Sequence, residues 1–215
     1  MRRVLWAVFL CAAAVVLASV PSASDATPIG PNCGTCQGST YELSYSGSPI
    51  STTATTETFE ITYTIDTSGY NGNGVFLNTV ALKVASSFVD ATLVSAPGGV
   101  ANWAEMFGGL SQAGCTGSGS GYDCVRWQTT LSLSPGVPNA TPYVWVFDIE
   151  VPTGTLFTGL DQASVKARYV DAYGSKRDAL VSENITLTNV PEPRLGLLAL
   201  ALPSLALWVR ARRRL

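Results

Sequence analysis

Cysteines are the side chains of this sequence best suited to covalent or metal chemistry. Between residues 28 and 189 there are four, namely Cys33, Cys36, Cys115 and Cys124. Such a set can form two disulfides, act as a redox dithiol through its Cys-X-X-Cys spacing, or bind zinc through all four sulfurs. A redox dithiol favours a helix start after a strand, whereas Cys33 follows a Pro-Asn pair in a coil-like segment. Zinc ligands usually pair at a spacing of about two to four residues, and eight residues separate Cys115 from Cys124.

Two structural disulfides are therefore the favoured interpretation, in a chain whose two ends indicate export. Cys115–Cys124 would close the Gly/Ser-rich loop 116–123, and Cys33–Cys36 would then pair by default. Redox and zinc chemistry stay open as alternatives. We predict no cofactor and no metal ligand.

Paired carboxyls form the second group with a chemistry of its own, because two of them can hydrolyse a glycosidic bond. Glu57 with Glu60, and Asp148 with Glu150, are candidates by residue type. Solvated carboxylates on strand faces are the simpler interpretation, so we predict no catalytic residue. The chain has no histidine, which removes most Ser-His-Asp, Cys-His and histidine–metal sites.

Two further features could bind ligands. Residues 66–74, DTSGYNGNG, loosely resemble a calcium loop but lack the closing glutamate, so a polar turn is the favoured interpretation. Trp103, Trp127 and Trp145 could stack on sugars if they were exposed, although tryptophans of this kind more often belong to a core.

Alternating apolar residues predict the strands that must position these side chains. The inward-facing sets are Phe59, Ile61, Tyr63 and Ile65; Phe76, Val80, Leu82 and Val84, with Asn78 as an exception; Val125, Trp127, Leu131 and Leu133; and Tyr143, Trp145, Phe147, Ile149 and Val151. Weaker strands are expected near residues 43 and 91, a hairpin over 164–173 and 179–187, and one short helix within 101–110. We predict an all-β antiparallel β-sandwich of about eight strands, Ig-like or jelly-roll in type, over residues 27–188. Residues 27–39 would be a loose lead-in.

The N-terminal residues 1–26 have the three parts of a secretory signal peptide. A Met-Arg-Arg start precedes 17 mostly apolar residues (4–20), and Pro21 and small residues follow. Cleavage after Ser24 or Ala26 would also remove Cys11. An uncleaved membrane anchor is the alternative, but the run is at the lower limit for a membrane span. The secretion translocon is the expected partner.

The C-terminal residues 189–215 carry the most specific signal. Val190-Pro191-Glu192-Pro193 cannot be helical before its prolines, residues 195–209 contain no charge, and residues 210–215 form an Arg-rich tail. The arginines are Arg210, Arg212, Arg213 and Arg214. The uncharged run makes about 22 Å of helix, which snorkelling arginines and local bilayer thinning adapt to a ~30 Å membrane core. The positive-inside rule keeps the arginines cytoplasmic, so the body would lie outside the membrane.

This tripartite end resembles the PEP-CTERM sorting signal of Gram-negative bacteria. The resemblance covers the last ~26 residues, and it implies that an exosortase-type membrane cysteine enzyme reads Pro191, Glu192 and Pro193. The four tail arginines would be the stop signal. The resemblance also implies association with exopolysaccharide and biofilm, and a final location at the cell surface or in the extracellular matrix. A plain tail anchor is the alternative.

Composition narrows the function of the body. Only 13% of residues are charged, which suits an exported β-rich protein. Between residues 27 and 191 six basic residues face thirteen acidic ones, a net charge of about −7, so we expect no nucleic-acid partner. The favoured hypothesis is a non-enzymatic exported protein. A carbohydrate-binding module is the alternative, and a two-carboxylate glycoside hydrolase is less favoured.

Overall fold

The computed structural model describes residues 28–189 apart from 87, 118, 120, 129–133, 156 and 158–162. The regular secondary structure of the described residues is β-strand, apart from one 3-10 turn, η1 (Val100–Asn102), and no α-helix occurs among them. Sheet A has the order β14 (Leu187–Asn189), β1 (Thr40–Tyr45), β3 (Thr56–Asp66), β11 (Pro142–Pro152) and β5 (Asp90–Ser95), and β2 (Ser51–Thr52) pairs with β3. Sheet B has the order β13 (Val181–Asn184), β12 (Ser164–Val170), β4 (Phe76–Lys83), β9 (Asp123–Trp127) and β6 (Trp103–Phe107), and β10 (Val137–Pro138) pairs with β4. Neighbouring strands are antiparallel except β1 and β14, which are parallel.

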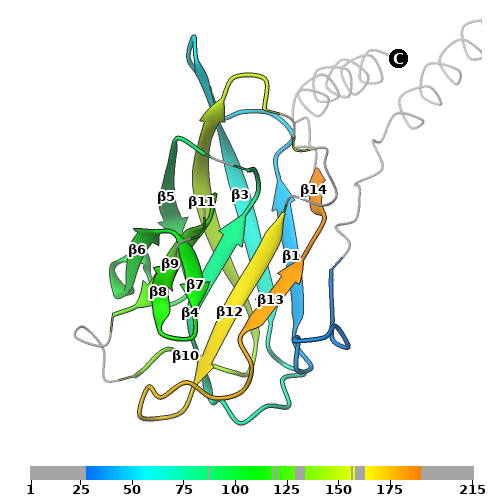
Figure 1. The fold of residues 1–215 in the computed structure, drawn as a ribbon, viewed down its shortest axis with the longest axis vertical. Coiled ribbons are helices and arrows are strands. Elements are labelled where there is room, and N and C mark those ends of the chain that lie inside the picture. Colours follow the sequence, from blue (N-terminus) through cyan, green and yellow to red (C-terminus); the bar gives the residue numbers. More distant parts are fainter. Residues whose placement is uncertain are drawn as a thin grey trace, which may run out of the picture.

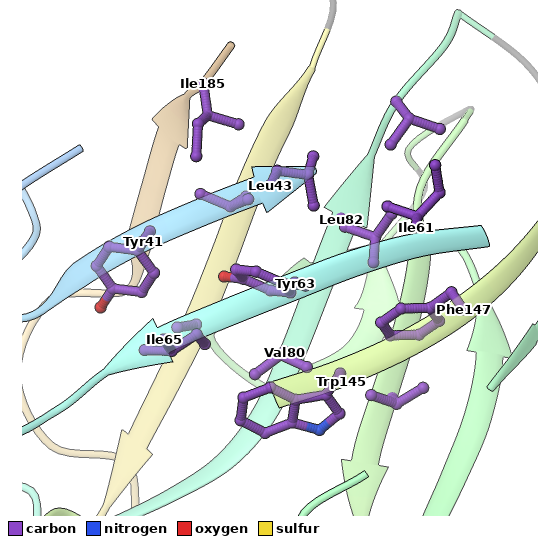
Figure 2. Packing of buried hydrophobic residues seen from close by; sticks show 14 of the residues in the cluster. Tyr41, Leu43, Ile61, Tyr63, Ile65, Val80, Leu82, Trp145, Phe147 and Ile185 are labelled. Atoms are coloured by element: carbon purple, nitrogen blue, oxygen red, sulfur yellow. The ribbon is translucent and has the colours of Figure 1, made fainter. Parts of the chain in front are cut away.

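The two sheets face each other across one hydrophobic core (Figure 1). In β3 the buried residues are Phe59, Ile61, Tyr63 and Ile65, and in β11 they are Trp145, Phe147, Ile149 and Val151. Figure 2 shows side chains of sheet A, such as Tyr63 and Phe147, meeting Val80 and Leu82 of sheet B. This confirms the predicted all-β class, the two-layer arrangement and the inward faces of β3 and β11.

Strand β4 follows its predicted pattern over only part of its length. Val80 and Leu82 face the core as expected, but Leu77 takes the place predicted for Phe76. The pairing with β12 shifts between Arg168 and Tyr169, so that Thr79 lies opposite Arg168 and Leu77 opposite Tyr169. The extra residue therefore lies in β4, and an extra residue reverses which side chains of a strand face inward. This bulge explains why Asn78 is an exception to the alternation.

The short helix predicted within residues 101–110 is wrong. After the η1 turn the chain enters β6, which pairs with β9 over all five residues. Apolar residues at 103, 106, 107 and 110 imitate a helical spacing, yet Trp103 points into the core while Phe107 is 65% exposed. The count of about eight strands was too low because the additional strands have only two to five residues, too few to show an alternation.

A small third layer covers the outer face of sheet B. Strands β7 (Gly109–Ser111) and β8 (Gly114–Gly117) form a hairpin, and Leu110 and Cys115 pack against Ala81 and Cys124. The neighbours of Ala81 and Cys124 along each strand, such as Val80 and Val125, face the main core. The hairpin therefore lies on the opposite surface of the sheet from that core.

The sandwich has two open sides, where the sheets end (Figure 1). The disulfide side is bordered by β1 and β14 of sheet A and by β13 of sheet B. The acid side is bordered by β5 and β6. Across the disulfide side the hydroxyls of Tyr41 and Tyr169 lie 2.9 Å apart, and near the acid side the rings of Trp103 and Trp145 meet at 5.4 Å.

Candidate functional site

Both predicted disulfides are confirmed. Cys33 bonds to Cys36 with Cα atoms 5.1 Å apart, and Cys115 bonds to Cys124 with Cα atoms 5.7 Å apart. Cys36 belongs to the core between the sheets, whereas Cys115 and Cys124 belong to the hairpin layer outside sheet B. The four sulfurs do not converge, so they do not form the zinc site that the sequence left open. Cys36 is fully buried in a turn rather than at a helix start, which disfavours the redox alternative.

The Cys33–Cys36 turn is not a loose lead-in. Ile29 exchanges backbone hydrogen bonds with Tyr41 of β1 at 2.8 and 2.9 Å. Toward sheet B, the Thr35 amide and hydroxyl donate hydrogen bonds to Oε1 of Glu183 in β13, at 2.8 and 2.5 Å. The Ser182 amide in turn donates to the Thr35 hydroxyl at 3.1 Å. The turn therefore bridges β1 and β13 and closes the disulfide side.

The loop that resembled a calcium site is organised by a protein carboxylate. Asp178 Oδ2 accepts hydrogen bonds from the Tyr70 hydroxyl at 2.6 Å and from the amides of Asn73 and Gly74 at 2.6 and 2.9 Å. The Asn73 side-chain amide donates to Oδ1 at 2.9 Å. Burial opposes ionisation, but these donors together lower the pKa of Asp178. The loop presents donors to an anion here, so this part of it is a structured turn rather than a cation site.

The tryptophans considered as a sugar platform lie in the core. Trp103, Trp127 and Trp145 are all buried, and the ring of Trp103 packs edge-on against the other two at 5.4 Å. Their indoles are not available to stack on an external sugar.

Of the predicted acid pairs, Asp148 and Glu150 lie on the outer surface of sheet A together with Glu60, whereas Glu57 has the parity of the inward-facing Phe59 in β3, so Glu57 and Glu60 do not form a pair. Asp148 and Glu150 alternate with the buried Phe147 and Ile149, and across the strands Glu60 lies opposite Asp148 and Glu150 opposite Asp90. Burial raises the pKa of Asp148. Glu57 accepts a hydrogen bond from the Gly154 amide at 3.2 Å. Glu60, Asp148, Glu150 and Asp90 therefore form a cross-strand ladder on one flat face.

A different acid pair, which the sequence did not single out, lies on the acid side. Asp123 of β9 is fully buried, with a relative exposure of 0%, and its carboxyl meets that of Glu105 of β6. No donor group of the described residues lies in good hydrogen-bond geometry with either Asp123 oxygen or with Glu105 Oε1, although the Cys124 amide is near enough to the Asp123 carboxyl to lower its pKa in part. Asp123 lies in register with Leu82 and Phe107, between an apolar core strand and the edge of the sheet.

The electrostatics of this pair are unfavourable when both carboxyls are ionised. Burial, followed by repulsion from Glu105, raises the pKa of Asp123 to about 8, and Asp90 adds to the repulsion. A hydrogen bond between two carboxyl groups requires that one of them carries a proton. Among the described residues the one ion pair joins Arg177 to Asp171, so no lysine or arginine neutralises Glu105 or Asp123.

A sequence signal for this pair existed. Asp123 has the same parity along β9 as Val125 and Trp127, and Glu105 has the same parity along β6 as Trp103. A charged residue within an inward-facing set is the mark of a buried acid.

The predicted sorting residues lie outside the described residues. These are Pro191, Glu192, Pro193, Arg210, Arg212, Arg213 and Arg214, together with the signal peptide 1–26 and the apolar run 195–209. Within the part of the chain that the structure describes, no helix has the length and apolar character needed to span a bilayer. The last described strand, β14, ends at Asn189, two residues before Pro191. No protein-family model matches the chain, and no curated protein matches it.

Proposed function

We propose that the chain is an exported, non-enzymatic protein that is sorted at the membrane through residues 190–215. The observation that carries the proposal is the order of three parts within the last 26 residues: a Pro-Glu-Pro segment, an uncharged run and an arginine cluster. The N-terminal signal sequence supplies the export route that such sorting requires. Two disulfides support an oxidising, extracytoplasmic location for the body.

The sorting residues have separate physical roles in this proposal. The apolar run 195–209 enters the bilayer, and Arg210 and Arg212–Arg214 hold its end on the cytoplasmic side. Pro191 and Pro193 keep the preceding segment extended, so that Glu192 stands clear of the membrane on the outer side. An exosortase-type membrane enzyme then recognises this segment and cleaves near it.

The body is delivered to the surface or the extracellular matrix of a Gram-negative bacterium, where it associates with exopolysaccharide. Consecutive strands such as β3, β4, β5 and β6 alternate between the two sheets, which supports an Ig-like or jelly-roll sandwich. Burial of Trp103, Trp127 and Trp145 weakens the alternative of a carbohydrate-binding module. A hydrolase is not favoured either, because the buried Asp123 cannot touch a polysaccharide.

The test compares cell fractions of a host that contains the sorting enzyme, expressing the full chain with Glu192 intact or as Glu192→Ala. We expect a shortened, released form from the intact chain and membrane retention of the variant. Glu60→Ala is the matched control, because Glu60 is an exposed glutamate of the body, and it should be processed normally. Equal processing of the intact chain and Glu192→Ala would overturn the proposal.

A further inference from the structure

The basic residues of the body are gathered on one of its two sheets, although its net charge is negative. No strand of sheet A contains a lysine or an arginine, whereas four of the six basic residues between residues 27 and 191 belong to sheet B. These four form the basic stripe: Lys83, Arg126, Lys166 and Arg168. We propose that the basic stripe binds a linear polysaccharide that carries carboxylates. This inference rests on the proposed association with exopolysaccharide and names the chemistry of the polymer.

Strand pairing places the basic stripe on the outer face of sheet B. Arg126 of β9 and Arg168 of β12 both lie opposite Thr79, on the two sides of β4. Lys166 lies opposite Ala81, which packs against the β7–β8 hairpin outside the sheet. The stripe therefore shares its surface with the hairpin and faces away from the main core.

The charges of the stripe have no anionic partner within the described part of the chain. The acidic residues in the strands of sheet B are Glu105, Asp123 and Glu183, and each has the parity of a core residue in its own strand. The one ion pair among the described residues lies outside the stripe. Burial, followed by repulsion from the exposed Arg126, lowers the pKa of Arg168. An added anion would relieve this repulsion.

Neutral groups of the protein fix the position of Arg168. Its Nη1 donates to Asn78 Oδ1 at 3.0 Å, and its Nε donates to the Gln112 carbonyl at 3.2 Å. A guanidinium has five N–H donors, so most of them stay available for a ligand. Asn78 is the extra residue of the bulge in β4, and bulges often re-aim a side chain beside a functional site.

The two lysines of the stripe are held near one aromatic ring. Nζ of Lys166 lies 4.6 Å from the centroid of the Tyr122 ring, and Nζ of Lys83 lies 5.8 Å from it. The Tyr122 hydroxyl shares a hydrogen bond of 2.7 Å with the Ser164 hydroxyl, which anchors the ring. A ring face attracts ammonium groups without neutralising them. Two cations are thus gathered here without a counter-ion, which favours an anionic ligand.

The layout of the stripe favours a narrow polymer over a flat protein surface. Alternate residues of a strand are about 7 Å apart, and the cations occupy three successive rows of this kind, at residues 79, 81 and 83 of β4. The hairpin stands beside these rows, so a thin chain can follow them where a flat surface cannot lie down. Guanidinium groups pair with carboxylates through two parallel hydrogen bonds. Binding of this kind depends on charge and needs none of the buried tryptophans.

The test measures binding of polygalacturonate, a polymer of uronic acids, to the full chain in an uncharged detergent. In the reference chain the four arginines of the tail 210–215 are replaced by Gln, so that the tail cannot bind the polymer. We expect the reference chain to bind polygalacturonate at low ionic strength and to release it as NaCl is raised toward about 1 M. Neutral dextran should not bind. Arg126→Gln/Lys166→Gln, added to the reference chain, should weaken binding by about tenfold.

Lys176→Gln/Arg177→Gln is the matched control, because it removes the same charge from the turn between β12 and β13, and it should bind like the reference chain. Arg126→Gln/Lys83→Gln is the second variant if the first fails to fold. Absence of polygalacturonate binding, equal weakening in the stripe and control variants, or equally tight binding of duplex DNA would overturn the proposal. Glu192→Ala, which tests sorting, should bind polygalacturonate unchanged, so the two proposals can fail separately.

Discussion

The two open sides of the sandwich differ in whether their carboxylates receive hydrogen bonds. On the disulfide side, Glu183 accepts two hydrogen bonds from Thr35, and nearby Asp178 accepts four from Tyr70, Asn73 and Gly74. On the acid side, Asp123 and Glu105 face each other, and three of their oxygens are buried without donors. Asp and Glu carboxylates therefore stabilise the fold on the disulfide side, and they destabilise it on the acid side when both are ionised.

The difference shows which groups satisfy the polar atoms on each side of the sandwich. The disulfide side is closed by protein atoms alone. The turn 31–39 even contacts loop 66–74 directly, because a Cβ on Gly38, whose φ is +87°, would overlap the Gly69 carbonyl. The Asp123–Glu105 pair on the acid side forms a comparable hydrogen bond only when the two carboxyls share a proton. Stability should therefore depend on solution conditions mainly through the acid side.

The largest expected effect comes from breaking the disulfide side. Replacing Cys33 and Cys36 together by Ala should lower the free energy of unfolding by about 2–3 kcal/mol, measured by urea denaturation. Hydrogen exchange at the amides of Thr35 and Ser182 should accelerate, because the turn then loses its fixed shape. The double variant Cys115→Ala/Cys124→Ala removes the other disulfide and should leave exchange at these two amides slow. Equal acceleration in both variants would contradict this account.

A smaller effect of opposite sign is expected on the acid side when Asp123 is changed to Asn. The pKa of Asp123 rises from 3.8 to about 8 on folding, so the folded state binds this proton more tightly than the unfolded state. The free energy of unfolding of the unmodified chain should therefore decrease as the pH rises from about 4 to about 8. Asp123→Asn removes this decrease, and at pH above 8 it should be more stable than the unmodified chain by about 2 kcal/mol.

Asp178→Asn is the matched control for that pH series. The pKa of Asp178 is lowered in the folded state, so its contribution is present above the unfolded pKa and is lost as the pH falls through the folded pKa. The variant should therefore be less stable than the unmodified chain at neutral pH. If both Asp→Asn variants shifted stability in the same direction at pH 9, the contrast between the two sides would fail.

The sequence predicted the features that depend on residues close together along the chain. Period-2 alternation identified β3 and β11 because Phe59–Ile65 and Trp145–Val151 keep one face over long strands. The disulfides followed from the number and spacing of four cysteines. The bulge at Asn78 and the strand β6 were missed, because a register shift and a five-residue strand leave little mark in a single sequence.

The candidate site depended on a pairing that spacing does not reveal. Glu57 with Glu60, and Asp148 with Glu150, were chosen because they are close along the chain, but alternation places Glu57 and Glu60 on opposite faces of β3 and leaves Asp148 and Glu150 on one flat surface. Glu105 and Asp123 are far apart along the chain and meet only because β6 pairs with β9. In that pairing Trp103 lies opposite Trp127 and their rings pack edge-on, and sequence periodicity does not reveal such a partner.

The smallest expected effect compares the same substitution on the two sides. Glu183→Gln keeps the size of the side chain but replaces charge-assisted hydrogen bonds from Thr35 by neutral ones, so it should cost about 0.5–1 kcal/mol in urea denaturation at pH 7.5. Glu105→Gln removes a like charge beside Asp123 and adds an amide donor, so it should have no cost or a gain of similar size. A cost for Glu105→Gln equal to that for Glu183→Gln would mean that the Glu105 carboxylate is already satisfied by protein atoms.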